Sequence, residues 1–330
     1  MRAMVLAAGL GKRLRPLTFA LPKPLAPVAN RPVMEHILEH LAGQGFGEVI
    51  ANTSHLGEQI QDRFGDGSAL GVELRYSEEH ELLGTAGGVR NVADFLTGGD
   101  DDSFLIISGD ALTDIDLRAM RERHASHDGI ATLAVKKVAD TREYGVVIHG
   151  PDGRVEGFQE KPDPAEALSD LGNCGIYMFR REIFDHFPEP AFVDWAMDVF
   201  PRLLEGDVSF YVHEFSDYWN DIGSLDEYRQ GNFDALTGAV RLGVAAEEVA
   251  ADVRSAGTEW PGDAEVTGPA LFGSDCEVGA RSWLHGPLVI GDGARIGAGA
   301  RLREAVVLPG AEVPAGAALA GAIVLPPPAR

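Results

Sequence analysis

The sequence is informative first for what it lacks. Only 2 of its 330 residues are cysteine, and Cys174 and Cys276 stand far apart. Two distant cysteines form neither a disulfide framework nor a zinc-ligand cluster, so a reducing cytoplasm is the expected setting. No apolar run approaches the roughly 18 residues that span a bilayer, and we therefore expect no membrane partner.

Basic residues are scarce as well. The chain has 28 Lys and Arg against 51 Asp and Glu, a net charge of −23. Such a chain repels nucleic-acid backbones at long range, so we expect no nucleic-acid partner. Residues 1–34 nevertheless contain no acidic residue, and their basic residues are Arg2, Lys12, Arg13, Arg15, Lys23 and Arg31. This acid-free cationic segment predicts a site for an anionic ligand.

Residues 1–235 alternate strand-like and helix-like segments. The expected strands are 4–7, 48–51, 72–76, 103–108 and 130–138, and the expected helices are 33–41, 56–64 and 88–96. This alternation predicts an α/β domain with a Rossmann-like, mostly parallel sheet covered by helices. In such sheets ligands bind at the carboxyl ends of the strands. The loops after Ala7 and after Ser108 are therefore the candidate site.

A different pattern follows an Ala- and Gly-rich connecting segment at 236–260. Apolar residues recur every six positions at Val266, Phe272, Val278, Leu284, Ile290, Ile296, Leu302 and Leu308, and after a one-residue slip at Val313, Leu319 and Leu325. A period of six fits neither a helix nor a simple strand. It predicts a second domain at 261–330, a parallel β-helix in which three hexads make one coil.

The loop after the first strand has the composition of a phosphate site. Residues 6–18 (LAAGLGKRLRPLT) place two glycines among cations, and glycines let main-chain N–H groups approach phosphate oxygens. The loop equally fits a tight turn with a solvated basic face. Prolines on both sides of Lys23 favour the phosphate site, because they fix the backbone that carries this lysine.

These motifs together resemble the sugar-nucleotide pyrophosphorylase family. The resemblance rests on residues 7–18 (AAGLGKRLRPLT) and 22–28 (PKPLAPV) and extends over essentially the whole chain. It implies the nucleotide-diphospho-sugar transferase fold followed by a left-handed β-helix. It also implies an enzyme that joins a nucleoside triphosphate to a sugar 1-phosphate and releases pyrophosphate.

The resemblance assigns roles to residues of the loops. Arg15 would hold the leaving pyrophosphate, and Lys23 would stabilise charge on the α-phosphate. The residues expected to bind the nucleotide are Leu6, Ala8, Gly9, Gly11, Lys12, Arg13, Gly84 and Thr85. The residues expected to bind the sugar phosphate are Gly145, Glu160, Lys161 and Asn173.

Asp110 is the first candidate metal ligand. It follows the apolar strand 103–108, and a carboxylate at a strand's carboxyl end is well placed to hold Mg²⁺ together with substrate phosphates. By resemblance Asp221 is the second ligand. Asp114 and Asp116 are expected to cap a helix that starts near Leu117.

The substrate pair stays open at this stage. Residues 84–87 (GTAG) are most similar to enzymes that use GTP and mannose 1-phosphate, and glucose 1-phosphate with dTTP or UTP is the alternative. More distant alternatives are a glycosyltransferase that consumes a nucleotide sugar and a non-catalytic regulatory paralogue. His285, the one histidine within the hexads, raises a further alternative of acyl transfer by the β-helix. We expect the β-helix to support a homo-oligomer instead.

Overall fold

The structure is a computed structural model that describes residues 1–187, 192–244 and 246–327. Contacts between Cα atoms divide the chain into two compact units. The first unit comprises residues 1–10, 21–24 and 37–221, and the second comprises residues 11–20, 25–36 and 222–330. The predicted domain boundaries at 235 and 260 remain a prediction.

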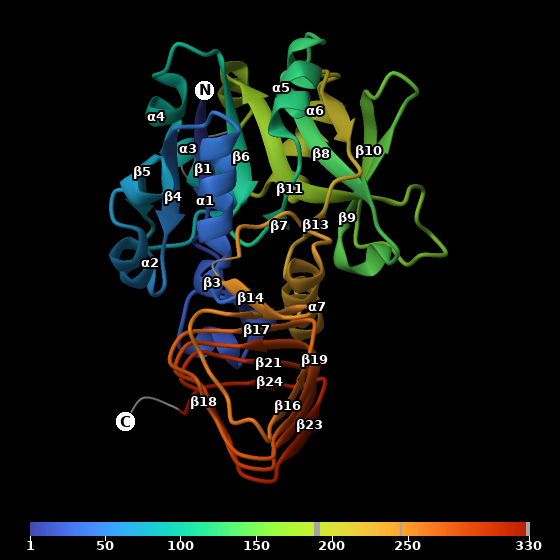
Figure 1. Cartoon of the computed structure of the whole chain (residues 1–330). Coiled ribbons are helices and arrows are strands. Elements are labelled where there is room, and N and C mark those ends of the chain that lie inside the picture. The colour runs from blue at the N-terminus through green and yellow to red at the C-terminus, as the bar shows by residue number, and fades with distance from the viewer. Residues whose placement is uncertain (188–191, 245, 328–330) are drawn as a thin grey trace. The chain divides into compact units, whose positions relative to one another are not determined.

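A nine-stranded sheet forms the centre of the first unit (Figure 1). Its main path runs β10 (Val155–Glu160), β9 (Gly145–His149), β11 (Leu171–Arg180), β6 (Ser103–Ser108), β1 (Arg2–Leu6), β4 (Glu48–Thr53) and β5 (Glu73–Glu78). Two further strands, β8 (Ala131–Lys137) and β12 (Tyr211–Glu214), pair with each other, and β8 also pairs with β11. A two-stranded pair of β7 (Leu112–Thr113) and β13 (Trp219–Asn220) lies apart from this sheet.

The sheet is mixed in direction. Strands β6, β1, β4 and β5 are parallel, whereas β11 is antiparallel to β6 and β10 is antiparallel to β9. The α/β prediction is confirmed, but the parallel arrangement covers only part of the sheet. The connection between β9 and β10 is too short for a crossover, so these strands form a hairpin. After β1 the chain builds β4 and β5 on one side and β6 on the other, which makes the β1/β6 edge a topological switch point.

Helices connect the strands of the first unit. They are α2 (Gly57–Phe64), α3 (Gly84–Asn91), α4 (Ala93–Thr97), α5 (Leu117–Ala125) and α6 (Phe200–Glu205), and α1 (Val33–Gly43) crosses the division between the units. Among the described residues no helix is long and apolar enough to cross a membrane.

Two local predictions need correction. The helix expected over 88–96 is two helices, because Val92 leaves the helical region with φ −114° and ψ 20°. The first of them begins at Gly84, so the glycine motif lies within the helix rather than before it. Asp116 caps α5 as expected, since its Oδ1 accepts from the main-chain N–H groups of Arg118 and Ala119. Asp114 does not cap this helix, and its Oδ1 accepts from Tyr218 N at 2.8 Å.

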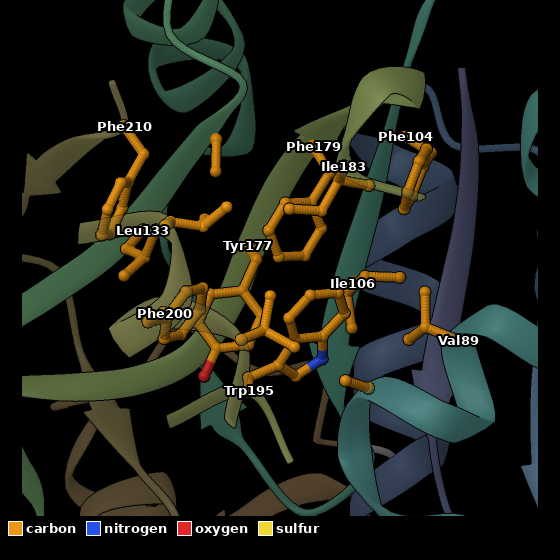
Figure 2. Close-up of a cluster of buried hydrophobic side chains, with 14 of the residues drawn as sticks. Val89, Phe104, Ile106, Leu133, Tyr177, Phe179, Ile183, Trp195, Phe200 and Phe210 are labelled. Atoms are coloured by element: carbon orange, nitrogen blue, oxygen red, sulfur yellow. The ribbon is translucent and has the colours of Figure 1, made fainter. Parts of the chain in front are cut away.

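An aromatic cluster forms part of the core of the first unit (Figure 2). Trp195 is 1% exposed, and its ring centroid lies 4.4 Å from that of Phe179 and 5.8 Å from that of Phe200. Burying a large aromatic side chain contributes roughly 2–3 kcal/mol, and stacked pairs add to this. The segment that carries Trp195 is therefore held firmly to the sheet.

The second unit contains one long helix and a set of short strands (Figure 1). The helix is α7 (Leu225–Thr237), and a small antiparallel pair is β2 (Pro27–Val28) with β3 (Arg31–Pro32). The remaining strands are β14 (Glu247–Ala250), β15 (Val253–Ser255), β16 (Glu265–Thr267), β17 (Ala270–Phe272), β18 (Glu277–Val278), β19 (Trp283–Ile290), β20 (Arg295–Ile296), β21 (Arg301–Val307), β22 (Glu312–Val313), β23 (Ala318–Ala320) and β24 (Ile323–Val324).

β14 and β15 are antiparallel, and the strands from β15 onward pair in parallel at intervals close to three hexads. Phe272 pairs with Ile290, and Ile290 pairs with Val307. The first step spans three hexads and the second is one residue shorter, because the register shifts between His285 and Leu288, ahead of the slip that the sequence shows after Leu308. Seven of the eleven periodic side chains are 3% exposed or less, namely Phe272, Leu284, Ile290, Ile296, Leu302, Leu308 and Val313. Val266, Val278 and Leu319 are partly buried and pack against the same core. The hexad pattern thus marks the inward-facing residues of the parallel ladders.

Further short helices lie between these elements. The 3₁₀ helices are η1 (Lys12–Leu14), η2 (Leu17–Phe19), η3 (Lys23–Leu25), η4 (Ser68–Leu70), η5 (Thr141–Glu143) and η6 (Arg181–His186), and the π-helix is η7 (Trp195–Val199).

Candidate functional site

A cavity of about 220 Å³ lies at the carboxyl ends of the parallel strands in the first unit. Its lining comprises Leu6, Ala8, Gly9, Asn52, Glu79, Leu82, Gly84, Thr85, Ser108, Asp110 and Phe192. Strands β1 and β6 end at lining residues, β4 ends one residue after Asn52, and β5 ends one residue before Glu79, as their parallel direction leads one to expect. The cavity therefore occupies the place where α/β sheets bind ligands.

The sequence predicted about half of this lining. The predicted residues that meet at the cavity are Leu6, Ala8, Gly9, Gly84, Thr85 and Asp110. The residues that sequence reasoning missed are Asn52, Glu79, Leu82, Ser108 and Phe192. For Asn52 and Glu79 a signal existed, because a polar residue that follows a parallel strand stands at the same edge as the predicted loops.

Asn52 and Glu79 connect two loops of the cavity. Asn52 Oδ1 accepts from Ala7 N at 2.8 Å, and its Nδ2 donates to Glu79 Oε1 at 2.7 Å. Glu79 Oε2 in turn accepts from Leu83 N at 3.1 Å. A Cβ at Gly88 would lie 2.5 Å from Glu79 Oε1, so only glycine leaves room for this pair. The network fixes the loop after β1 to the start of α3.

The glycine motif at the start of α3 is held by a neighbouring segment. Gly84 has φ +76°, and a Cβ there would lie 2.5 Å from Val193 O. Val193 O also accepts from Ala86 N at 2.9 Å. Thr85 Oγ1 donates to Asp194 Oδ2 at 2.8 Å. Gly84 thus meets both conditions that favour glycine, a left-handed backbone and a close main-chain approach.

Lys23 is buried rather than free. It is 9% exposed, and its ammonium group donates to Asp110 Oδ2 and, at 3.0 Å, to the main-chain oxygen of Asp221. Ser108 Oγ donates to the other carboxylate oxygen of Asp110. The structure therefore brings together the predicted catalytic lysine and the two predicted metal ligands.

The residues around Lys23 fit a magnesium ion. A cationic group already lies against the Asp110 carboxylate, which lines the cavity and is 23% exposed. Mg²⁺ takes one or two carboxylates and fills its remaining positions with water and substrate phosphates. Among the described residues no group of three His, Cys, Asp or Glu side chains is placed to hold a metal. Asp110 and Asp221 are the candidates that remain.

The predicted sugar residues Gly145, Glu160 and Lys161 also meet. A Cβ at Gly145 would lie 3.2 Å from Glu160 Oε2, and Lys161 N donates to Tyr144 O at 3.2 Å. Lys161 Nζ lies 3.9 Å from Glu160 Oε1, and both side chains are nearly half exposed. An exposed pair at this distance is held weakly, so both charged groups are accessible to a ligand.

Aromatic contacts link the sugar residues to the segment that carries Asp221. The rings of Tyr144 and Trp219 lie 5.3 Å apart, and Trp219 Nε1 donates to Cys174 O at 3.1 Å. Asn173, next to Cys174, donates to Tyr177 OH at 2.9 Å. Burial raises the pKa of the Cys174 thiol, which makes it a packing residue and not a nucleophile.

The remaining predicted residues, Gly11, Lys12, Arg13 and Arg15, belong to the second unit. Gly11 has φ +57° and precedes η1, and its carbonyl accepts from Thr18 Oγ1 at 2.8 Å. Lys12, Arg13 and Arg15 are exposed, and the Arg15 guanidinium lies 5.1 Å from the centre of the Phe19 ring. Their roles toward a substrate stay predictions.

Comparison with known proteins agrees with the family resemblance and the fold. The family model described as nucleotidyl transferase matches residues 2–238. A UTP–glucose-1-phosphate uridylyltransferase of Synechocystis is 35% identical over 322 residues, which are 93% of this chain and 82% of that protein. A mannose-1-phosphate guanylyltransferase of Mycobacterium tuberculosis is 35% identical over 306 residues, 92% of this chain and 79% of that protein.

A solved structure supports the fold. A Bacillus anthracis protein described as a glucose-1-phosphate thymidylyltransferase superposes with a TM-score of 0.64 at 24% identity. The match covers 74% of this chain and 97% of that one. The family model and the two relatives confirm the family resemblance inferred from the sequence. The chain belongs to the nucleotidyl transferase family and is an enzyme of the sugar-1-phosphate nucleotidyltransferase type.

Proposed function

We propose that this enzyme uses GTP and mannose 1-phosphate and forms GDP-mannose and pyrophosphate. The observation that supports a guanine base is Glu79, whose buried carboxylate lines the cavity and is 5% exposed. A carboxylate only accepts hydrogen bonds. Guanine presents two adjacent donors on one edge, N1–H and the exocyclic amine. Adenine and cytosine present a ring acceptor at the corresponding position and would be rejected.

The alternative substrate pair is glucose 1-phosphate with UTP or dTTP. Uracil and thymine each present one ring N–H, so a carboxylate tolerates them with one bond fewer. The relatives divide in the same way, since one is named for uridylyl transfer and the other for guanylyl transfer. Relaxed specificity between these bases follows from the same chemistry.

The proposed reaction is a direct displacement. An oxygen of the sugar 1-phosphate attacks the α-phosphorus, and pyrophosphate leaves. The protein must hold two anions in line and neutralise the charge that develops. In this proposal Lys23 stabilises the α-phosphate, Arg15 holds the leaving pyrophosphate, and Lys161 holds the incoming sugar phosphate. Glu160 accepts hydrogen bonds from the sugar hydroxyls, and Asn173 can both donate to them and accept from them.

Magnesium is the proposed cofactor, with Asp110 and Asp221 as its ligands. When bound, Mg²⁺ supplies positive charge to the phosphates. Lys23 then has two roles, because it contacts Asp110 and is also proposed to stabilise the α-phosphate. It keeps the carboxylate oriented, and it supplies a positive charge of its own.

We also propose a support role for residues 261–330. The parallel ladders with three-hexad steps favour a left-handed β-helix, and its open edge is a surface for a homo-oligomer. His285, the candidate base for acyl transfer, donates from Nε2 to Glu265 Oε1 at 2.9 Å and stacks on Trp283. These contacts favour a structural role for His285. Cys174 and Cys276 are buried, unpaired thiols, which favours a cytoplasmic location.

The test is pyrophosphate release from a matrix of triphosphates and sugar 1-phosphates. We expect the highest kcat/KM with GTP and mannose 1-phosphate, lower values with UTP or dTTP, and none with ATP or CTP. Preference for ATP or CTP would contradict the role of Glu79. Release of a nucleoside diphosphate from a nucleotide sugar would indicate the glycosyltransferase instead. Binding without turnover for every pair would indicate the regulatory paralogue.

A further inference from the structure

One large apolar side chain of the first unit is exposed at the cavity. Phe192 is 71% exposed and belongs to the cavity lining, beside Leu82, which is 38% exposed. Its neighbours along the chain behave differently, since Val193 is 5% exposed and Trp195 is 1% exposed. Exposing a phenyl ring to water is unfavourable, so a ring that faces a cavity is a candidate to contact the ligand of that cavity.

The main chain fixes Phe192 in this place. Val193 N donates to Leu83 O at 2.9 Å, and Val193 O accepts from Ala86 N at 2.9 Å and from Gly87 N at 3.1 Å. These three bonds attach the residue after Phe192 to the start of α3. Trp195 is anchored in the aromatic cluster (Figure 2). The ring of Phe192 is therefore carried by a fixed backbone, although the side chain itself has little protein around it.

The cavity has two chemically different ends. At one end Asp110 accepts from the ammonium group of Lys23 and from Ser108 Oγ, a charged arrangement that suits phosphates and their cation. Leu82 and Phe192 stand beside the start of α3, together with the carboxylate of Glu79. A nucleotide has the same polarity, with a charged phosphate end and a planar base. The apolar end of the cavity fits the base.

We propose that Phe192 packs its ring against the nucleotide base and is a binding residue for this reaction. The inference rests on the proposed nucleotidyl transfer and adds a contact that is independent of hydrogen bonding. Stacking on an aromatic ring tolerates any base, because every base has a π-face. Phe192 thus supplies affinity, whereas Glu79 supplies the choice of base.

The test compares Phe192→Ala with two variants. Phe192→Tyr keeps the ring, and Leu168→Ala removes a side chain that is 75% exposed and is not part of the cavity lining. Calorimetry measures the Kd of GTP, of UTP and of inorganic pyrophosphate with Mg²⁺ present, and turnover gives both KM values. Because Phe192 is exposed, Phe192→Ala is expected to keep the wild-type Tm.

We expect Phe192→Ala to weaken GTP and UTP binding on the order of tenfold. Pyrophosphate binding and the KM for sugar 1-phosphate stay unchanged, and Phe192→Tyr and Leu168→Ala behave like wild type. Equal nucleotide affinity in wild type and Phe192→Ala overturns the inference while the proposed function stands. A rise only in the KM for sugar 1-phosphate also overturns it, because the ring would then contact the sugar. A wild-type chain that binds no nucleotide overturns both proposals.

Discussion

The ammonium group of Lys23 joins the carboxylate of Asp110 to the main-chain oxygen of Asp221, residues that are 87 and 198 positions away in the sequence. Both contacts lie within the first unit. The lysine is therefore held by two protein groups and is not only a charge that is available to a substrate. This relationship predicts that its removal affects catalysis in a way that removal of a surface lysine does not.

Lys23→Ala is expected to lower kcat by about a hundredfold to a thousandfold, the typical loss for a group that stabilises transition-state charge. Pyrophosphate release measures it. The matched control is Lys137→Ala, because Lys137 ends β8 and is exposed. Turnover within a few fold of wild type for Lys23→Ala would show that the lysine serves the fold alone.

Gly88→Ala is expected to weaken nucleotide binding and lower stability by about 1–3 kcal/mol, since its Cβ would lie 2.5 Å from Glu79 Oε1 and 2.9 Å from Asn52 Nδ2. Gly43→Ala is the control, because Gly43 also lies in a helix and has nothing within 4 Å of its Cβ position. Urea unfolding and nucleotide titration measure the two effects. Identical behaviour of the two variants would mean that the Asn52–Glu79 pair tolerates displacement.

Inosine triphosphate tests the role proposed for Glu79. Inosine lacks the exocyclic amine of guanine and keeps the ring N–H, so one proposed hydrogen bond to the buried carboxylate is lost. The wild-type KM for ITP is expected to exceed that for GTP roughly tenfold, the cost of about one hydrogen bond to a charged group. Equal KM values would place the exocyclic amine away from Glu79.

Stability is expected to fall with acidification because a buried and a partly buried histidine are neutral in the folded chain. Burial, with Arg180 and His127 nearby, lowers the pKa of His124 from 6.5 to about 3. Burial, with Arg123 and Arg180 against the opposing Asp128, lowers the pKa of His127 to about 4. The unfolded chain then binds more protons below pH 6.5, so stability is full above that pH and is lost as pH falls toward 4.

The measurement is the free energy of unfolding across this pH range. His127→Phe keeps a ring next to Tyr211 but cannot titrate, so its stability is expected to depend less on pH. His80→Asn is the control, because His80 is exposed. A pH slope in His127→Phe as steep as that of wild type would assign the acid loss to other groups.

Leu302→Ala tests the ladders of the second unit. Leu302 is fully buried and pairs with Leu284 and Leu319 in neighbouring strands. Its truncation is expected to cost about 2–5 kcal/mol in the free energy of unfolding. Leu319 is only partly buried, so Leu319→Ala is expected to cost less. Equal costs would contradict the inward placement of the periodic side chains.

Much of the fold was predictable because its signals are local. The apolar strand at 103–108, the glycine loop after β1 and the six-residue period each lie within a short stretch of sequence. The antiparallel half of the sheet was missed, although Pro151, Asp152 and Gly153 between β9 and β10 have the composition of a tight turn. That turn sets the antiparallel direction of β10 relative to β9, which the hydrophobic pattern does not show.

The missed part of the site depends on contacts between distant residues. Asn52 bonds to a main-chain group 45 positions away and to Glu79, 27 positions away, and neither side chain belongs to a sequence motif. Phe192 was missed for the same reason, since only folding brings its segment to the start of α3. The spacing of residues in the sequence alone does not predict contacts between residues so far apart in the chain.

The fate of the α-phosphorus is the most direct test of the proposed nucleotidyl transfer. The enzyme is incubated with Mg²⁺, mannose 1-phosphate and GTP labelled at the α-phosphorus, and the products are separated. Nucleotidyl transfer predicts that the label appears in GDP-mannose and that the other product is unlabelled pyrophosphate. Label in free GDP or GMP, or release of orthophosphate in place of pyrophosphate, would contradict nucleotidyl transfer at this site.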